Sequence, residues 1–345
     1  MYRPRTKWEW AFLSTVVLQT IIMIALEGLL LVGYRQLIEP IASKVESASP
    51  ISVTIGLVLF DCFGQIALAV DGLRSKNNIQ LFALCLCNGC IFLITFLEYM
   101  QIHETILTVS LQLARSNAPA GLEEEEIWQS LQPVLLAAFV CVGACSIGLP
   151  FVTYYLHQVF AWAIYKHISA DVDVRRRHLQ YQLYLVSAKL CLCSSVSFLF
   201  IYGFVELRPT QPEFAVTMLL VPAVVLKPVL AVYFIKREVA VGTAAIVVLY
   251  LAEAAYLLSR IVALAGKSKQ SAADDAIILF AIAALFCAIL TLATVVQCLR
   301  NFGHGLKPLL LARQGQRGGE SLAMTGFPRE LSQSELYLVR RFSMD

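Results

Sequence analysis

The sequence predicts an all-α protein, a polytopic bundle of about eight transmembrane helices followed by a mostly disordered cytoplasmic tail. Three observations lead to this prediction. Hydrophobic residues make up 58% of the 345 residues and charged residues only 15%, whereas charged residues approach a quarter of a soluble domain. Apolar runs long enough to cross a bilayer recur along the chain. Lys and Arg gather in every second connection between these runs.

The predicted bundle covers residues 1–300. Its first apolar run follows a basic N-terminus and lacks a small-residue cleavage site, so we expect a retained span. Polar connections separate the later runs, and Pro150 predicts a kink, with a short interfacial helix around Phe160 and Trp162 after it. Residues 301–345 turn rich in Gly and Ser and form the tail. The predicted spans are residues 10–33, 51–71, 79–100, 131–154, 182–204, 214–234, 239–260 and 276–298.

The distribution of basic residues predicts the orientation of the bundle. The N-terminus and the connections after the second, fourth, sixth and eighth spans hold most of the Lys and Arg residues. Cytoplasmic loops carry such an excess of positive charge. Both termini are therefore predicted to be cytoplasmic.

Composition and motifs argue against several classes of protein. The net charge is only +3 and the basic residues are dispersed, so no nucleic-acid partner is expected. All ten cysteines fall in or beside apolar runs, where Cys packs as a small hydrophobe. The five histidines lack HxxxH or HExxH spacing, and no Gly-x-Ser-x-Gly occurs. We therefore expect a protein that is not an enzyme and has no cofactor or metal site.

Several ionisable residues lie inside the predicted spans, where each costs about 2.5 to 3.5 kcal/mol at mid-bilayer. Two lysines fall in the cytoplasmic third, three glutamates fall in the lumenal third, and one aspartate lies nearest the middle. In that order they are Lys189 and Lys227; Glu27, Glu98 and Glu253; and Asp61.

Two interpretations of these charges are open. In the first, Asp61 forms an ion pair with Lys189 or Lys227 that stabilises the packing of two helices, while the glutamates reach lumenal water. In the second, Asp61 and the two lysines frame a polar cavity for a solute or a proton, with Glu253 as a lumenal gate. Pro222 and Pro228 favour the second interpretation because they would break the sixth span beside Lys227.

The connection after the fourth span predicts a contact surface on the cytoplasmic side. It reads as an amphipathic helix with aromatic anchors and three consecutive arginines, which either anchors it to an anionic leaflet or docks a cytosolic sorting partner. The candidate docking residues are Trp162, Tyr165, Lys166, Asp171, Arg175, Arg176 and Arg177. Near the C-terminus, Arg340-Arg-Phe-Ser343 has the form of a basophilic-kinase substrate, so Ser343 is a candidate phosphorylation site.

The same connection carries the pattern W-x-I-Y-K-x-I-x-A-D followed by paired arginines and Tyr-Gln. With the blocks at residues 7–10, 71–80, 301–308 and 340–343, it resembles an uncharacterised family of fungal multi-pass Golgi apparatus membrane proteins. The resemblance implies residence in the Golgi membrane and implies no reaction. This chain departs from the pattern at Ser169, where Gly is expected, and at His178, where an aromatic is expected. It also has Cys191 in place of an expected acid, which would leave Lys189 dependent on Asp61.

The leading hypothesis is a Golgi membrane protein that organises membranes or sorts cargo through its cytoplasmic loop and tail. The alternative is a secondary transporter or channel that uses Asp61, Lys189, Lys227 and Glu253. A heptahelical-type receptor is a weaker alternative, because the eighth span returns the chain to the side of its N-terminus. The bilayer is the one certain partner, and the sequence makes no prediction of oligomeric state.

Overall fold

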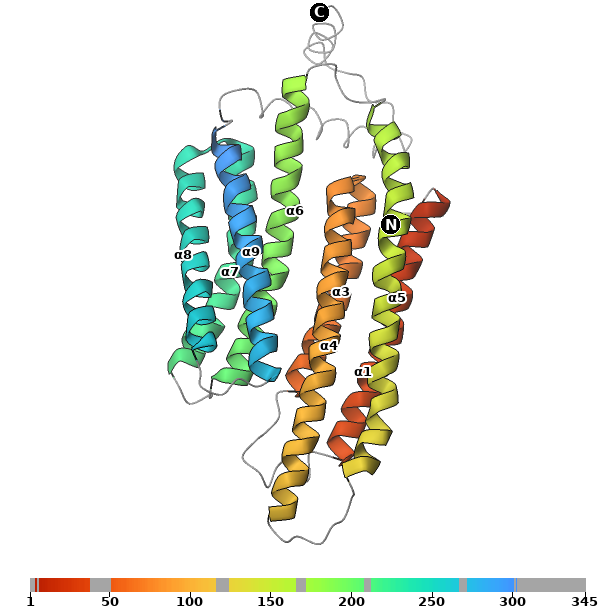
Figure 1. Cartoon of the computed structure of the whole chain (residues 1–345). Helices are drawn as coiled ribbons and strands as arrows, with labels where there is room; N and C mark the ends of the chain where they lie inside the picture. The colour runs from red at the N-terminus through yellow and green to blue at the C-terminus, as the bar shows by residue number, and fades with distance from the viewer. Residues whose placement is uncertain are drawn as a thin grey trace, which may run out of the picture.

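The computed structural model describes residues 4, 6–37, 51–115, 124–165, 172–207, 212–266, 272–300 and 302. Within these residues all regular structure is helical, which confirms the predicted all-α bundle (Figure 1). The π-helix η1 (Tyr202–Glu206) extends the end of α6. The α-helices are α1 (Lys7–Leu37), α3 (Ile51–Ser75), α4 (Asn78–Arg115), α5 (Glu124–Tyr165), α6 (Val172–Ile201), α7 (Pro212–Arg237), α8 (Ala240–Ala265) and α9 (Ala272–Arg300).

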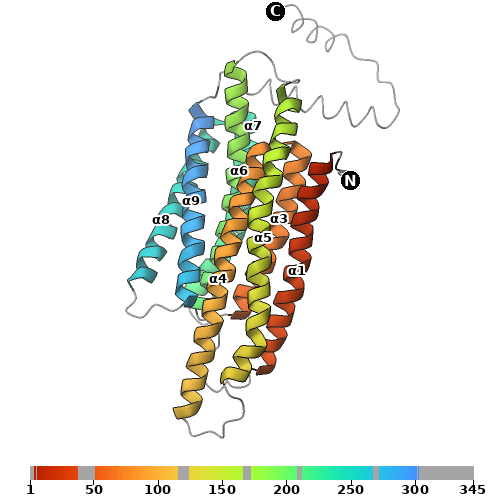
Figure 2. The same cartoon turned by 45° about the vertical axis from the view of Figure 1, so that its right-hand side comes forward.

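The helices form two rings of four that lie side by side. In the first ring, α1 and α4 each pack against both α3 and α5. In the second ring, α6 and α8 each pack against both α7 and α9. Helices α3 and α4 contact α6, and α4 also contacts α9, so these contacts join the rings (Figure 2). Each ring is built from consecutive helices, as short connections between antiparallel neighbours favour.

Eight of the described helices are long and apolar enough to cross a membrane. Their outward faces carry large apolar side chains, among them Leu86, Ile147 and Val241, which are 73%, 79% and 82% exposed. Such faces would be unfavourable in water and are expected against lipid tails. The chain is therefore a multi-pass membrane protein in contact with the bilayer.

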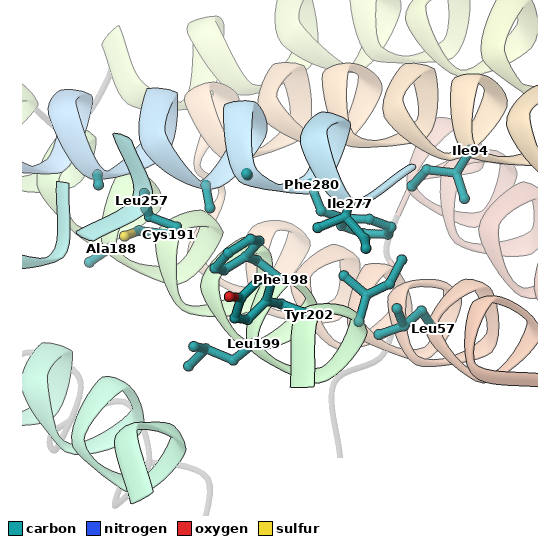
Figure 3. Packing of buried hydrophobic residues seen from close by; sticks show 14 of the residues in the cluster. Leu57, Ile94, Ala188, Cys191, Phe198, Leu199, Tyr202, Leu257, Ile277 and Phe280 are labelled. Atoms are coloured by element: carbon teal, nitrogen blue, oxygen red, sulfur yellow. The ribbon is translucent and has the colours of Figure 1, made fainter. Parts of the chain in front are cut away.

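A shared apolar core holds the two rings together. Leu57 of α3 and Ile94 of α4 belong to the same buried cluster as Phe198 of α6 and Phe280 of α9 (Figure 3). Alanines of α9 are completely buried in this cluster, and small side chains let helices approach closely inside a membrane. The fixed contact between the rings sets the depth at which polar residues of one ring meet those of the other.

The prolines do not interrupt their helices. Helix α5 passes through Pro150 and continues to Tyr165, so the separate interfacial helix expected around Phe160 and Trp162 is not formed. Helix α7 contains both Pro222 and Pro228 without a break, so the prediction of a broken helix beside Lys227 is wrong. Inside lipid, a break would leave more backbone groups unpaired than the proline itself does, because no water is present to bind them.

Candidate functional site

Buried polar residues follow one face of α4, and we call them the α4 polar row. They are Gln80, Asn88, Thr95, Glu98 and Gln101, all of which are buried. At a rise of about 1.5 Å per residue, the row extends for about 32 Å along the helix. This length matches a hydrocarbon core about 30 Å thick. The buried face of α4 therefore carries hydrogen-bonding groups over a length comparable to the depth of a membrane.

Asn88 joins three helices in the middle of the first ring. Because α1 and α4 both pack on α3 and α5, they face each other across the ring. The Gln19 amide of α1 donates to Asn88 Oδ1 at 2.7 Å, and the Asn88 amide donates to Ser146 Oγ of α5 at 2.9 Å. These bonds cross the ring interior and satisfy polar groups that lipid cannot.

Two carboxyl groups meet further along the same ring. Glu27 of α1 and Glu98 of α4 interact through their side chains and are 1% and 2% exposed. Neither oxygen of Glu27, nor Oε1 of Glu98, accepts a bond from a donor in the described part of the chain. One turn beyond Glu98, the Thr54 hydroxyl donates to Gln101 Oε1 at 3.4 Å. The prediction that these glutamates reach lumenal water is wrong, because α1 and α4 enclose them.

Lys189 links the two rings at the Gln80 end of the row. Its ammonium forms an ion pair with Asp71 of α3 and donates to Gln80 Oε1 at 3.3 Å. The Gln80 amide donates to Asp71 at 3.1 Å and to the Leu68 carbonyl at 2.7 Å. Three helices, α3, α4 and α6, therefore share one charged cluster.

A second ion pair lies inside the second ring. Lys227 of α7 is paired with Glu253 of α8, and the ammonium lies 4.0 Å from the centroid of the Tyr250 ring. Cys191 Sγ of α6 lies 3.9 Å from Glu253 Oε2. The hydroxyls of Tyr184 and Tyr250 and the Oε1 atom of Glu253 are buried without a partner among the described residues. The pair is thus enclosed by aromatic rings and by one thiol.

Asp61 does not pair with either lysine, so the first interpretation of the buried charges is wrong on this point. It accepts a hydrogen bond from Ser197 Oγ of α6 at 3.0 Å, across the boundary between the rings. Lys189 uses Asp71 and Lys227 uses Glu253. The six interior charges are therefore divided among separate contacts, and the expectation that Lys189 depends on Asp61 is also wrong.

Helix geometry explains these partners. Helices α7 and α8 are antiparallel and are joined at Glu238, so Lys227 and Glu253 lie at comparable distances from the turn. The remaining offset is about one turn of helix, which a lysine side chain can span. Helix α3 continues past residue 71 to Ser75, which brings Asp71 within reach of Lys189.

Most of the predicted docking residues cannot be placed in detail. Trp162 and Tyr165 belong to the last turn of α5, and the three arginines 175–177 belong to the start of α6. The Arg176 side chain is exposed. Lys166, Asp171 and Ser343 lie outside the described residues, as do the side chains of Trp162, Tyr165, Arg175 and Arg177.

The buried amides were not among the predicted site residues, because only the ionisable residues of the spans pointed to a site. Gln19, Asn88 and Gln101 lie in apolar runs, and helical spacing along the third span places the α4 polar row on one face. Asp71 was missed because the predicted span ended there. Arg260 of α8 was also missed; it donates to the Tyr202 hydroxyl at 3.1 Å.

The fold and its interior define a class: an eight-helix membrane protein with a polar interior in one half. Over 313 residues, the chain is 26% identical to a UPF0658 Golgi apparatus membrane protein of Schizosaccharomyces pombe, and this similarity covers 86% of the chain and 88% of the yeast protein. The resemblance to fungal Golgi apparatus membrane proteins is thereby confirmed. No protein-family model matches the chain, and no solved structure matches it.

Proposed function

We propose that this chain is a non-enzymatic transporter of a small polar solute in the Golgi membrane, with both termini in the cytoplasm. The observation that carries the proposal is the α4 polar row. One or two buried amides would suffice to fix the packing of a helix. A row that extends over the depth of the bilayer instead offers a solute successive hydrogen-bonding partners along its path.

Charge also supports a transport role. Buried carboxyl groups inside a membrane are costly, and structural ones are expected to have basic partners. Among the described residues, both interior lysines are already paired, Lys189 with Asp71 and Lys227 with Glu253. In the described part of the chain, Glu27 and Glu98 have no basic partner and lie beside each other in the ring that contains the α4 polar row.

The location and orientation rest on separate observations. The yeast relative is named as a Golgi apparatus membrane protein, and the connections on one side carry most of the basic residues. A fluorescent tag should co-localise with a Golgi marker, and tags at both termini should be cleaved when protease is added to intact vesicles. A tag that resists protease would refute the proposed topology.

Transport can be tested with purified protein in proteoliposomes. The vesicles are exposed to an extract of small polar solutes from Golgi-enriched membranes, and the retained solutes are compared by mass spectrometry. We expect one class of solute to accumulate with the unmodified chain. The Asn88→Leu variant should abolish accumulation, because it removes two hydrogen bonds from the centre of the α4 polar row.

A matched control lies on the same helix. Leu86 is 73% exposed and points away from the ring, so Leu86→Ile should transport as the unmodified chain does. Equal solute contents in protein-free vesicles and in vesicles containing the unmodified chain would refute the transporter proposal, and equal accumulation by the unmodified chain and Asn88→Leu would exclude a role for Asn88 in it.

Cargo sorting is the second candidate, and one observation favours it. Arg176 is exposed on the first turns of α6, which project beyond α9 and α3 at one end of the molecule (Figure 1). This segment is open to a cytosolic partner in the proposed topology. The test replaces arginines 175–177 by Ala and follows Golgi localisation and co-purified proteins. Unchanged localisation and unchanged partners would exclude a docking role for these arginines.

A further inference from the structure

The contact between Glu27 and Glu98 has a direct chemical consequence. Glu27 and Glu98 are neighbouring buried carboxyl groups, and if both were ionised they would offer each other only acceptors, with no hydrogen to share. Two neighbouring carboxylates that are shielded from water cannot both remain ionised unless a cation lies between them. The two side chains are 1% and 2% exposed, so water does not screen them.

The surroundings of the pair are acidic or neutral. Of the helices packed on α1, α3 brings Cys62 near Glu27, and Asp61 of α3 and Cys141 of α5 lie near Cys62 in turn. On α4, the amide Nε2 of Gln101 is buried without a partner among the described residues. No lysine or arginine contributes to these electrostatic interactions in the part of the chain that the structure describes.

The pair also lies on the proposed transport path. Glu98 belongs to the α4 polar row, between Thr95 and Gln101. Glu27 of α1 lies beside it, so the pair brings together the two helices that face each other across the ring. A proton held here lets the two carboxyl groups lie side by side, because two bare carboxylates repel each other.

We infer that Glu27 and Glu98 form a binding site for one proton, shared between the two carboxyl groups. If the chain is a transporter as proposed above, this is the site that couples proton movement to the solute. Loss of the proton leaves two neighbouring negative charges that repel each other, and rebinding removes this repulsion. The reaction is a proton transfer between carboxyl and water, with no other bond made or broken.

Infrared spectroscopy of the purified chain in lipid nanodiscs tests the site without any solute. At neutral pH we expect the carbonyl stretching band of one protonated carboxylic acid per chain. The band should shift when the carboxyl carbons of glutamate are isotopically labelled and should not shift when those of aspartate are labelled. This labelling uses the unmodified chain, so it stands even if a variant fails to fold.

Variants identify which glutamates hold the proton. The band should disappear in Glu27→Gln/Glu98→Gln and persist in Glu253→Gln, a matched control in which the lost carboxylate belongs to an ion pair with Lys227. A band that is absent from the unmodified chain, that shifts only with aspartate labelling, or that persists in the double variant would overturn the inference.

The two proposals fail separately. Vesicles that accumulate no solute, together with a band assigned to this pair, would refute transport and leave the proton site in place. Accumulation of a solute by a chain without the band would refute the proton site and leave transport in place.

Discussion

Lys227 of α7 and Glu253 of α8 form an ion pair inside the second ring of helices, next to the aromatic side chain of Tyr250. The relationship depends on the antiparallel packing of α7 on α8, because the two residues are far apart in sequence. Both lysine and carboxylate are largely buried, so each is the other's main compensation for the loss of water.

Removal of one member of this pair is expected to be far more costly than removal of both. Lys227→Met leaves Glu253 as an uncompensated buried charge and should lower the free energy of unfolding by about 3–5 kcal/mol. Lys227→Met/Glu253→Leu should recover most of this loss, because no charge remains. Denaturant titration in micelles measures both values, and a double variant as unstable as the single one would contradict the expectation.

The Lys189 and Asp71 pair should contribute less than the Lys227 pair. Its side chains are 36% and 48% exposed, so its attraction is screened. Asp71→Asn keeps the shape of the side chain and should lower the free energy of unfolding by about 0–1 kcal/mol. The same denaturant titration provides the comparison, and a loss as large as that in Lys227→Met would show that this contact between rings is stronger than its exposure implies.

The hydrogen bonds of Asn88 should matter for stability as well as for transport. Asn88→Leu leaves the Gln19 amide without its acceptor and leaves the Ser146 hydroxyl with only its 3.5 Å bond to the backbone carbonyl of residue 88. Unpaired buried groups of this kind cost about 1–3 kcal/mol. Thermal unfolding of the variant should show a clear decrease, whereas Leu86→Ile, on the exposed face of the same helix, should unfold at the temperature of the unmodified chain.

Two glycines provide a matched test of helix packing. A methyl group added at Gly242 of α8 would lie 2.6 Å from the Phe234 ring of α7, so Gly242→Ala must displace that ring. We expect a loss of about 1–3 kcal/mol, which is typical of overpacking. Gly28 has nothing within 4 Å of the same position, so Gly28→Ala should be neutral or should gain about 0.5–1 kcal/mol of helix stability. Equal effects would show that α7 and α8 pack less closely than described.

The fold was predictable because its signal is repeated and local. Each apolar run is long enough to identify a span without any knowledge of its neighbours, and α1 to α9 follow these runs. The break predicted at the prolines was wrong because it considered only their local effect on the backbone and not the surrounding lipid. In lipid, α7 stays helical around Pro222 and Pro228.

The site was only partly predictable. Six interior charges were named from the sequence, and Lys227 and Glu253 do meet. Their depths, however, were estimated from the ends of predicted spans, and errors of a few residues at those ends made Asp61 the expected partner of Lys189 or Lys227. Asp71 was lost to the same uncertainty. The amides of Gln19, Asn88 and Gln101 were visible in the sequence, but their importance depends on which helix faces which.

By itself, the sequence determined that this is an eight-span membrane protein, that its interior holds charges, and which side of the membrane is richer in basic residues. These properties follow from the length, hydropathy and charge of single segments. Only the tertiary structure decided that the spans close into two rings, that Asp61 bonds Ser197 instead of a lysine, and that Glu27 meets Glu98. Contacts across a ring depend on the rotation and depth of two helices at once, and neither quantity is encoded in the pattern of either helix alone.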